Sequence, residues 1–85
     1  MSRSLSVDIL LFASVAEASG QTKVRMPFIM GETVADLRQR IAEHLPIAAS
    51  SINSSRLARN EQFANDDEII LENDVIAVIP PVSGG

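Results

Sequence analysis

The sequence predicts an α+β fold in which one main helix packs on one face of a mixed sheet. Two segments near the start of the chain, residues 5–12 and 21–28, place apolar side chains at every second position, as half-buried strands do. A third segment, residues 33–45, repeats its apolar side chains at helical spacing. The 85 residues are sufficient for one domain with one small core.

The first strand is expected over Leu5–Phe12. Its predicted core face consists of Leu5, Val7, Ile9 and Leu11. The opposite face begins polar but ends with Leu10 and Phe12, which is unusual for a face in contact with solvent. Small residues over Ala13–Gly20 predict a short helical turn and then a chain reversal. Gln21–Phe28 predicts a second strand, antiparallel to the first, whose expected inward residues are Thr22, Val24, Met26 and Phe28.

The main helix is expected over Thr33–Leu45. Thr33 is suited to cap its N-terminus, and Asp36 follows three residues later, at the position that completes a capping box. The predicted apolar stripe consists of Val34, Leu37, Ile41 and Leu45. Pro46 cannot continue a helix and is expected to end it.

The second half of the chain predicts a loop and further strands. The small and polar residues of Ala48–Ser55 indicate a surface loop. Leu57–Phe63 indicates a short strand containing a turn at Asn60-Glu61, and two acidic turns separate it from a β-prone run at Val75–Ile79. This last strand is expected to lie parallel to the first, because the intervening helix provides the long connection that parallel neighbours require.

This order of elements is the β-grasp, or ubiquitin-like, arrangement. Residues 1–79 are predicted to form the domain. Residues 80–85 are predicted to form an extended C-terminal tail that the fold does not need.

The composition argues against several kinds of site. Without cysteine the chain cannot form disulfides, iron–sulfur clusters, thiolate zinc sites or a thiol nucleophile. His44 is the only histidine, and it is expected to be a solvated residue near the end of the helix. A net charge of −4 and the absence of Trp and Tyr make nucleic acid and anionic membranes poor partners and favour a basic protein. With no bilayer-length apolar run and no apparent signal segment, a cytoplasmic protein is expected.

The tail has a sequence suited to chemistry at the main-chain terminus. Its residues are Pro80, Pro81, Val82, Ser83, Gly84 and Gly85. The two prolines favour an extended backbone, and the two glycines lack side chains that would keep the last carbonyl out of a narrow channel. Once activated as an acyl-adenylate, such a carboxylate accepts sulfur or an amine, and the arm holds it in position for transfer.

The ending Ile79–Gly85, together with Leu11-Phe12-Ala13 and the Thr33-Val34 and Leu37-Arg38 pairs of the helix, resembles the small subunits of molybdopterin synthase, the MoaD-type sulfur carriers. The resemblance covers essentially the whole chain, and its most specific part is the PPVSGG ending. One departure is Asn73, which stands where family members commonly have glycine before the aspartate that leads into the final strand. Asparagine tolerates the left-handed conformation, so the turn is expected to be retained.

The resemblance implies that Gly85 is adenylated by a ubiquitin-activating-type adenylyltransferase and converted to a thiocarboxylate. The tail would enter the active site of the large subunit in a 2+2 heterotetramer, with Gly84 allowing the end of the chain to pass. Interface positions along it would be Pro80, Pro81, Val82 and Ser83. There the sulfur would attack cyclic pyranopterin monophosphate during molybdenum cofactor biosynthesis. A thiocarboxylate is a soft anion that needs no general base from this chain. The chain would then carry no bound cofactor or metal, only a transient AMP adduct, and it would supply the nucleophile without being a catalyst by itself.

Three apolar residues are candidates for the surface that contacts the large subunit. Phe12, Phe63 and Ile79 are predicted on the helix-free side of the sheet, where together they would form a patch that favours association. The resemblance implies the same contact role. The alternative is that the two phenylalanines only cover an edge of the core.

Two other functional classes compete with this interpretation. A related Gly-Gly carrier would deliver sulfur for thiamine or tRNA thiolation, or would be conjugated to lysines as a protein modifier. A ubiquitin-like binding module would have an inert tail. The cluster Asp66-Asp67-Glu68 is expected to be a solvated turn rather than a cation site. Solvated surface positions are expected for Lys23, Arg38, Arg40, Arg56 and Arg59.

Overall fold

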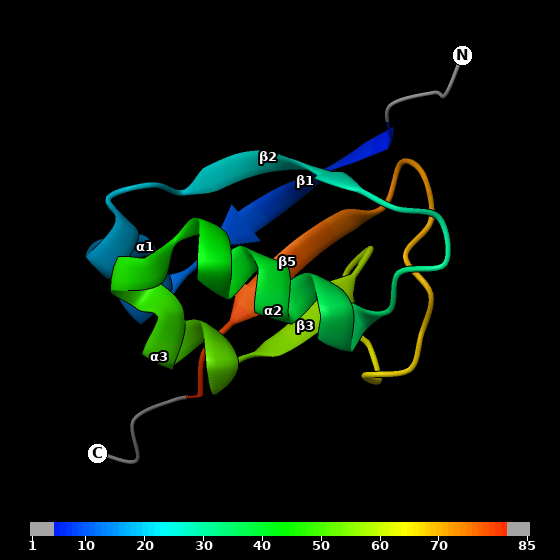
Figure 1. The fold of residues 1–85 in the computed structure, drawn as a ribbon. Helices are drawn as coiled ribbons and strands as arrows, with labels where there is room; N and C mark the ends of the chain where they lie inside the picture. The colour runs from blue at the N-terminus through cyan, green and yellow to red at the C-terminus, as the bar shows by residue number, and fades with distance from the viewer. Residues whose placement is uncertain (1–4, 82–85) are drawn as a thin grey trace.

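A computed structural model describes residues 5–81 of the chain. Figure 1 shows a twisted sheet with helices on one side of it. The strands are β1 (Leu5–Leu11), β2 (Lys23–Phe28), β3 (Arg56–Arg59), β4 (Gln62–Phe63) and β5 (Val75–Ile79). The helices are α1 (Ala13–Ser19), α2 (Val34–His44), the 3₁₀ turn η1 (Pro46–Ala48) and α3 (Ala49–Asn53).

The sheet is mixed, with the strand order β2-β1-β5-β3-β4. β1 pairs antiparallel with β2 and parallel with β5, while β3 pairs antiparallel with both β5 and β4. The predicted β-grasp arrangement is therefore confirmed, including the parallel placement of the last strand beside the first. The helix α2 crosses one face of the sheet, and none of the described helices lies on the other face (Figure 1).

The core lies between the sheet and α2. The residues predicted for the inward face of β1 are buried from Val7 to Leu11, and the four residues of the predicted helical stripe are all buried. Each large apolar side chain buried in this way contributes about 1.5–3 kcal/mol to the free energy of unfolding. Thr22, by contrast, is exposed and precedes β2, so its predicted inward position is wrong.

The start of α2 has the predicted capping box. The Thr33 hydroxyl oxygen accepts a hydrogen bond from the Asp36 amide at 3.2 Å, and the Asp36 carboxylate accepts one from the Thr33 amide at 3.1 Å. Two amides that the first helical turn would leave unpaired are thereby satisfied. At the other end, Pro46 begins the 3₁₀ turn η1, so the helix ends where the sequence indicates.

The segment predicted as a surface loop, Ala48–Ser55, is instead folded into the domain. It contains the short helix α3, and Ile52 is fully buried in the core. The Ser55 hydroxyl is also buried and donates to the carbonyl of Ser51 at 2.6 Å. A single large apolar residue among small polar ones has no periodicity, and a five-residue helix is too short to have shown one.

The turn at Asn60-Glu61 is confirmed, and it joins β3 to β4 as a hairpin. Both residues have positive φ, +52° and +73°, as does Asn73 at +73°. Asn73 thus adopts the left-handed conformation that the sequence analysis expects at this turn. Ala13 also has a positive φ, +50°, at the point where the chain leaves β1 and enters α1.

Three of the arginines expected at solvated positions are largely buried in ion pairs within the chain, so that expectation is wrong for them. Arg38 pairs with Asp66 at 2.7 Å, Arg40 with Glu32 at 2.8 Å, and Arg59 with Asp74 at 2.8 Å. Their side chains are only 17–29% exposed. Arg56 is exposed, as expected.

Two carboxylates of the acidic turn Asp66–Glu68, which was expected to be solvated, form ion pairs with arginines of the chain. The Arg38 guanidinium holds the pKa of the Asp66 carboxyl below its ordinary value through a hydrogen bond. The pKa of Glu68 is also lowered, first by the hydrogen bond it accepts from the Asn65 amide and further by Arg59. Among residues 5–81 there is no cluster of acidic or histidine side chains suited to holding a metal ion.

Candidate functional site

The candidate site is the sheet face opposite α2, close to the end of β5. A shallow apolar hollow lies on this face, with Glu61 at its margin. We call its apolar lining the helix-free apolar surface; its residues are Leu10, Phe12, Ala58, Phe63, Val75, Ala77 and Ile79.

Strand register places the centre of this surface in one row. Leu10 of β1 lies opposite Ala77 of β5, Ala77 lies opposite Ala58 of β3, and Ala58 lies opposite Phe63 of β4. Residues directly opposite in neighbouring strands share a face of the sheet. The row therefore crosses four strands, with small alanines in its centre and larger side chains at its ends.

Phe12 lies at the end of this surface where β1 stops. Its backbone is extended, and its carbonyl oxygen accepts hydrogen bonds from the amides of Val15 and Ala16 at 3.1 and 3.3 Å. The positive φ of Ala13 turns the chain sharply after it. The Phe12 side chain is 47% exposed and does not belong to the core.

Phe63 lies at the opposite end of the row, on the two-residue edge strand β4. Its side chain is 54% exposed, and the Arg56 guanidinium carbon lies 4.1 Å from the centre of its ring. A cation over an aromatic face at an exposed site contributes about 0.5–1 kcal/mol. Arg56 also lies opposite Ile79 in the β3–β5 ladder, so the stacked pair adjoins the last residue of β5.

The chain leaves the sheet beside this surface. Ile79 is half-buried, Pro80 is buried and Pro81 is exposed. Pro80 is thus covered by the domain, although the sequence placed it in a tail that the fold does not need. The predicted site residues Val82, Ser83, Gly84 and Gly85 lie outside the described residues.

The structure brings the predicted contact residues Phe12, Phe63 and Ile79 to one surface, and their role in binding stays a prediction. The exposure of the two phenylalanines argues against their being edges of the core. The sequence analysis did not predict the other four members of this surface, which are Leu10, Ala58, Val75 and Ala77. The signal for Leu10 was present in the apolar end of the outer face of β1.

Basic groups lie beside the apolar row on β2. Lys23, directly opposite Leu10, is 3.7 Å from the Asp8 carboxylate, and Arg25 pairs with the same carboxylate at 2.8 Å. The two basic side chains are more than half exposed, so their pairing with Asp8 contributes little to stability. His44 is exposed at the end of α2 and does not belong to this surface.

Comparison with protein families identifies the chain. A model of the ThiS family matches residues 9–85, nearly its full length. The chain belongs to the ThiS family. Within the described part of this ThiS-family protein, no helix has the length and apolar character needed to cross a membrane.

Relatives of this ThiS-family protein include two molybdopterin synthase sulfur carrier subunits. The one from Dictyostelium discoideum is 36% identical over 91% of this chain and 93% of its own length. The one from Arabidopsis thaliana is 31% identical over 96% of this chain and 85% of its own length. The resemblance seen in the sequence is therefore confirmed.

Solved structures support the same fold. The crystal structure of SAMP1 from Haloferax volcanii has a TM-score of 0.83 at 30% identity and covers 94% of this chain and 99% of its own. A chain of the complex of subunits 1 and 2 of molybdopterin-converting factor from Helicobacter pylori has a TM-score of 0.64 at 21% identity. The alignment covers 95% of this chain and all of the Helicobacter chain, a likeness of fold alone.

Proposed function

We propose that this chain is the sulfur carrier subunit of a molybdopterin synthase, with Gly85 as the residue that carries the sulfur. The observation that carries the proposal is the Gly84-Gly85 ending of this ThiS-family chain. Its relatives, aligned over most of their lengths, are named molybdopterin synthase sulfur carrier subunits. The position of the helix-free apolar surface, beside the point where the tail begins, supports it.

The chemistry begins with activation of the terminal carboxylate. A carboxylate oxygen of Gly85 attacks the α-phosphorus of ATP, which forms the acyl-adenylate and releases pyrophosphate. A persulfide of a donor protein then attacks the acyl carbon through its terminal sulfur and AMP leaves, which gives an acyl disulfide. A thiol then cleaves the sulfur–sulfur bond and carries the donor sulfur away as a mixed disulfide, so a thiocarboxylate remains at Gly85. A ubiquitin-activating-type adenylyltransferase performs the first step in this proposal.

Sulfur transfer then takes place in the active site of the large subunit. The thiocarboxylate is ionised at neutral pH, so its sulfur attacks the cyclic pyranopterin monophosphate without a base from this chain. Hydrolysis then breaks the bond between the Gly85 acyl carbon and the transferred sulfur, which returns Gly85 to a carboxylate, and two such transfers supply the two sulfurs of the dithiolene. Positioning by the tail makes each attack effectively intramolecular, and cationic groups of the large subunit would orient the anionic substrate.

The helix-free apolar surface is the proposed contact with the large subunit, and a 2+2 heterotetramer is the proposed assembly. The likeness of fold to a chain in the Helicobacter pylori complex of subunits 1 and 2 is compatible with this role. Phe12, Phe63 and Ile79 would be covered by the partner while the tail extends into it. A cytoplasmic location fits an activation step that consumes ATP.

Intact mass after co-expression with the activating enzyme and a sulfur donor tests the proposal. The expected result is an increase equal to one oxygen-for-sulfur exchange, located at Gly85 by fragmentation. The purified product should then convert the pyranopterin precursor when a molybdopterin synthase large subunit is added. An unchanged mass, despite an activating enzyme shown to be active on another carrier, would contradict it.

A protein modifier remains the second candidate, favoured by the 26% identity and TM-score of 0.82 with a structure named small archaeal modifier protein 1 from Haloferax volcanii. Both functions begin with adenylation of Gly85, so the product that forms after activation distinguishes them in the same preparation. A modifier forms amide bonds between Gly85 and lysines of other proteins. A sulfur carrier instead gives the thiocarboxylate and supports dithiolene formation.

A further inference from the structure

Arg56 differs from the other arginines that the structure describes. Each of those forms an ion pair with an acidic side chain of the chain itself, namely Arg25, Arg38, Arg40 and Arg59. Arg56 forms no ion pair and no side-chain hydrogen bond with any residue from 5 to 81, and its guanidinium stacks on the Phe63 ring instead. Its positive charge is therefore not compensated within the described part of the chain.

Strand register places Arg56 on the sheet face opposite α2, at the end of the sheet where the tail begins. It lies opposite Ile79 in the β3–β5 ladder and two residues before Ala58 on β3. Residues two apart along a strand, and residues directly opposite in neighbouring strands, share a face of the sheet. Both Ala58 and Ile79 belong to the helix-free apolar surface. The exposed Arg56 side chain thus borders the surface that we assign to the large subunit.

The stack on Phe63 prepares the guanidinium to bind an acceptor. The ring covers one side of the guanidinium, whose N–H groups point outward in its own plane. None of these donors bonds to a described residue. Because the ring already restricts the Arg56 side chain, an acceptor on another protein has less conformational freedom to remove when it binds.

The charges on this face differ from the charge of the whole chain, which is −4. On β2, Arg25 lies opposite Asp8, and Lys23 two residues earlier shares the same face; both pair with the Asp8 carboxylate. Glu61 lies at the margin of the apolar hollow and forms no ion pair with Arg56. The net charge alone favours a basic partner, but the uncompensated cation on this face favours an acidic group opposite Arg56.

A protein that covers Phe63 also removes water from Arg56, because the two side chains are in contact. A guanidinium that loses its water without gaining an acceptor opposes binding strongly. A carboxylate replaces that water best, since its two oxygens match the fork of the guanidinium with two parallel hydrogen bonds. Apolar contacts along the row from Leu10 to Phe63 cannot meet this requirement.

We propose that Arg56 is a specificity-determining residue, which pairs with a carboxylate of the large subunit when that subunit covers the helix-free apolar surface. This inference rests on the proposed function, because it takes the large subunit as the partner. It adds a condition on charge to the apolar contacts at Phe12, Phe63 and Ile79. A protein that places only apolar or basic groups against Arg56 is rejected, even where its shape fits the surface.

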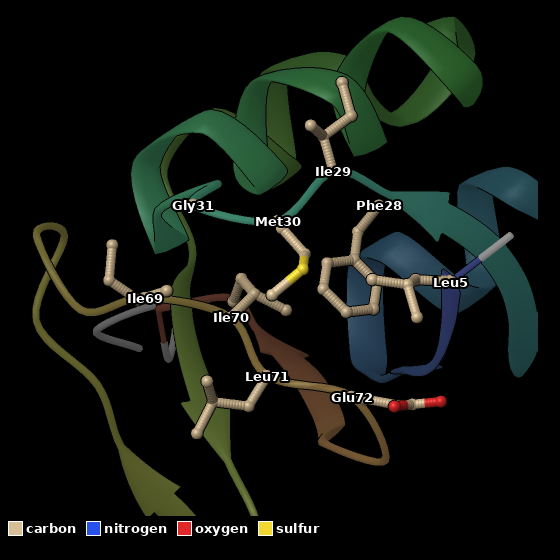
Figure 2. Close-up of a pocket in the computed structure, with 9 residues that line it drawn as sticks. All are labelled: Leu5, Phe28, Ile29, Met30, Gly31, Ile69, Ile70, Leu71 and Glu72. Carbon is tan, nitrogen blue, oxygen red and sulfur yellow. The ribbon is translucent and has the colours of Figure 1, made fainter. Parts of the chain in front are cut away.

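A second exposed apolar hollow provides a control position. It lies between residues 28–31 and 69–72, at the end of the sheet where β1 begins (Figure 2). Its described lining includes no lysine or arginine, and Met30 within it is 81% exposed. Met30→Glu therefore adds a negative charge to the chain without changing the surroundings of Arg56.

Calorimetric titration of the full chain with a molybdopterin synthase large subunit tests the proposal. Arg56→Met keeps a long side chain against Phe63 but removes the charge, so it should weaken binding at least about tenfold. Arg56→Lys keeps the charge and should lose less affinity than Arg56→Met. Arg25→Met, which removes a charge that Asp8 already compensates, should also lose less. Since Arg56 is exposed, its variants are expected to fold, and thermal unfolding checks this.

A charge exchange identifies the carboxylate. Arg56→Glu should weaken binding by about a hundredfold or more, because two like charges then meet, whereas Met30→Glu should bind like the parent chain. Acidic residues of the large subunit are then replaced singly by lysine. One such replacement should restore the binding of Arg56→Glu by at least about tenfold and should weaken the binding of the parent chain.

Four other results overturn the proposal. Equal affinities of Arg56→Met and the parent chain exclude the pair while leaving the sulfur-carrier function intact, because sulfur loading at Gly85 is measured on the parent. Equal losses in Arg56→Met and Arg25→Met show that only the total charge of the face matters. Failure of every lysine replacement to restore Arg56→Glu excludes a carboxylate partner. A parent chain that neither acquires sulfur nor binds the large subunit overturns the proposed function and this inference together.

Discussion

Arg56 stacks on Phe63, with its guanidinium carbon 4.1 Å from the centre of the ring, and it does so directly beside the last residue of β5. The edge strand β4 has only two residues and so forms few backbone hydrogen bonds with the rest of the sheet. The stacked guanidinium therefore helps to hold the exposed Phe63 ring against the sheet. It also places a positive charge at the margin of an apolar surface.

Phe63→Asp should weaken binding of the large subunit by roughly 10–100-fold, since a desolvated aromatic anchor at an interface contributes about 1–3 kcal/mol. Because the ring is 54% exposed in the free chain, the free energy of unfolding should change by less than about 1 kcal/mol. Calorimetric titration and denaturant unfolding measure the two effects. Ile47→Asp is the matched control, since Ile47 is 77% exposed away from this surface. Equal losses in both variants would contradict the assignment.

Removal of Gly85 should abolish sulfur transfer without affecting the fold. The carboxyl group that is adenylated and then receives sulfur would be shifted back by one residue, out of reach of the reacting groups. The measurement is molybdopterin formation with large subunit and activating enzyme, together with intact mass and thermal unfolding. The deletion variant should still bind the large subunit through the helix-free apolar surface. Retained sulfur transfer would show that the terminus is not the reactive group.

Acid should destabilise the protein through Asp74. Burial raises the pKa of this carboxyl, but hydrogen bonds from Arg59, Leu71 and Asn60 outweigh burial and leave the pKa below its ordinary 3.8. A carboxyl with a lower pKa in the folded state stabilises fully above its unfolded pKa and loses that stabilisation as pH falls through the folded value. The free energy of unfolding should therefore decline below about pH 4.

Asp74→Asn separates this contribution from the other carboxyls. The variant should lose about 1–3 kcal/mol near neutral pH, because hydrogen bonds to a charged acceptor are replaced by weaker ones. Its acid-induced loss below pH 4 should also be smaller than that of the parent chain. Urea unfolding at a series of pH values measures both. Parallel pH profiles for the two proteins would count against Asp74 as a source of the acid sensitivity.

Two left-handed asparagines should respond in opposite ways to glycine. Asn73 is exposed and makes no hydrogen bond through its side chain to the described residues, so Asn73→Gly should stabilise the protein by up to about 1 kcal/mol. The Asn60 side chain donates to Asp74 and accepts from the Val75 amide, both at 2.9 Å. Asn60→Gly should therefore destabilise by about 1–2 kcal/mol. Thermal unfolding of the two variants tests the contrast.

Ile52→Ala should destabilise the protein by about 2–4 kcal/mol, because it leaves a cavity beneath α3. The control is Ile47→Ala, a change of the same size at an exposed position five residues earlier, which should alter stability by less than about 0.5 kcal/mol. Denaturant unfolding gives both values. Equally small losses of unfolding free energy in both variants would instead support the sequence prediction that residues 48–55 form a surface loop.

Much of the fold was predictable because its signals are local. Alternation in β1 and β2, the capping box at Thr33 and the stop at Pro46 each depend on a few adjacent residues, and the structure has each of them. α3 was missed because Ile52 is its only large apolar residue, and burial of a lone side chain depends on what folds over it.

The amino-acid sequence by itself determined the order of the strands and the main helix, the resemblance to sulfur carriers and the glycine terminus. Only the tertiary structure decided which side chains meet across the sheet. The row from Leu10 to Phe63 joins strands far apart in the chain. The ion pairs Arg38–Asp66 and Arg59–Asp74 join residues 28 and 15 positions apart. Such contacts follow from strand register and from the packing of one element on another, which no local pattern of residues encodes.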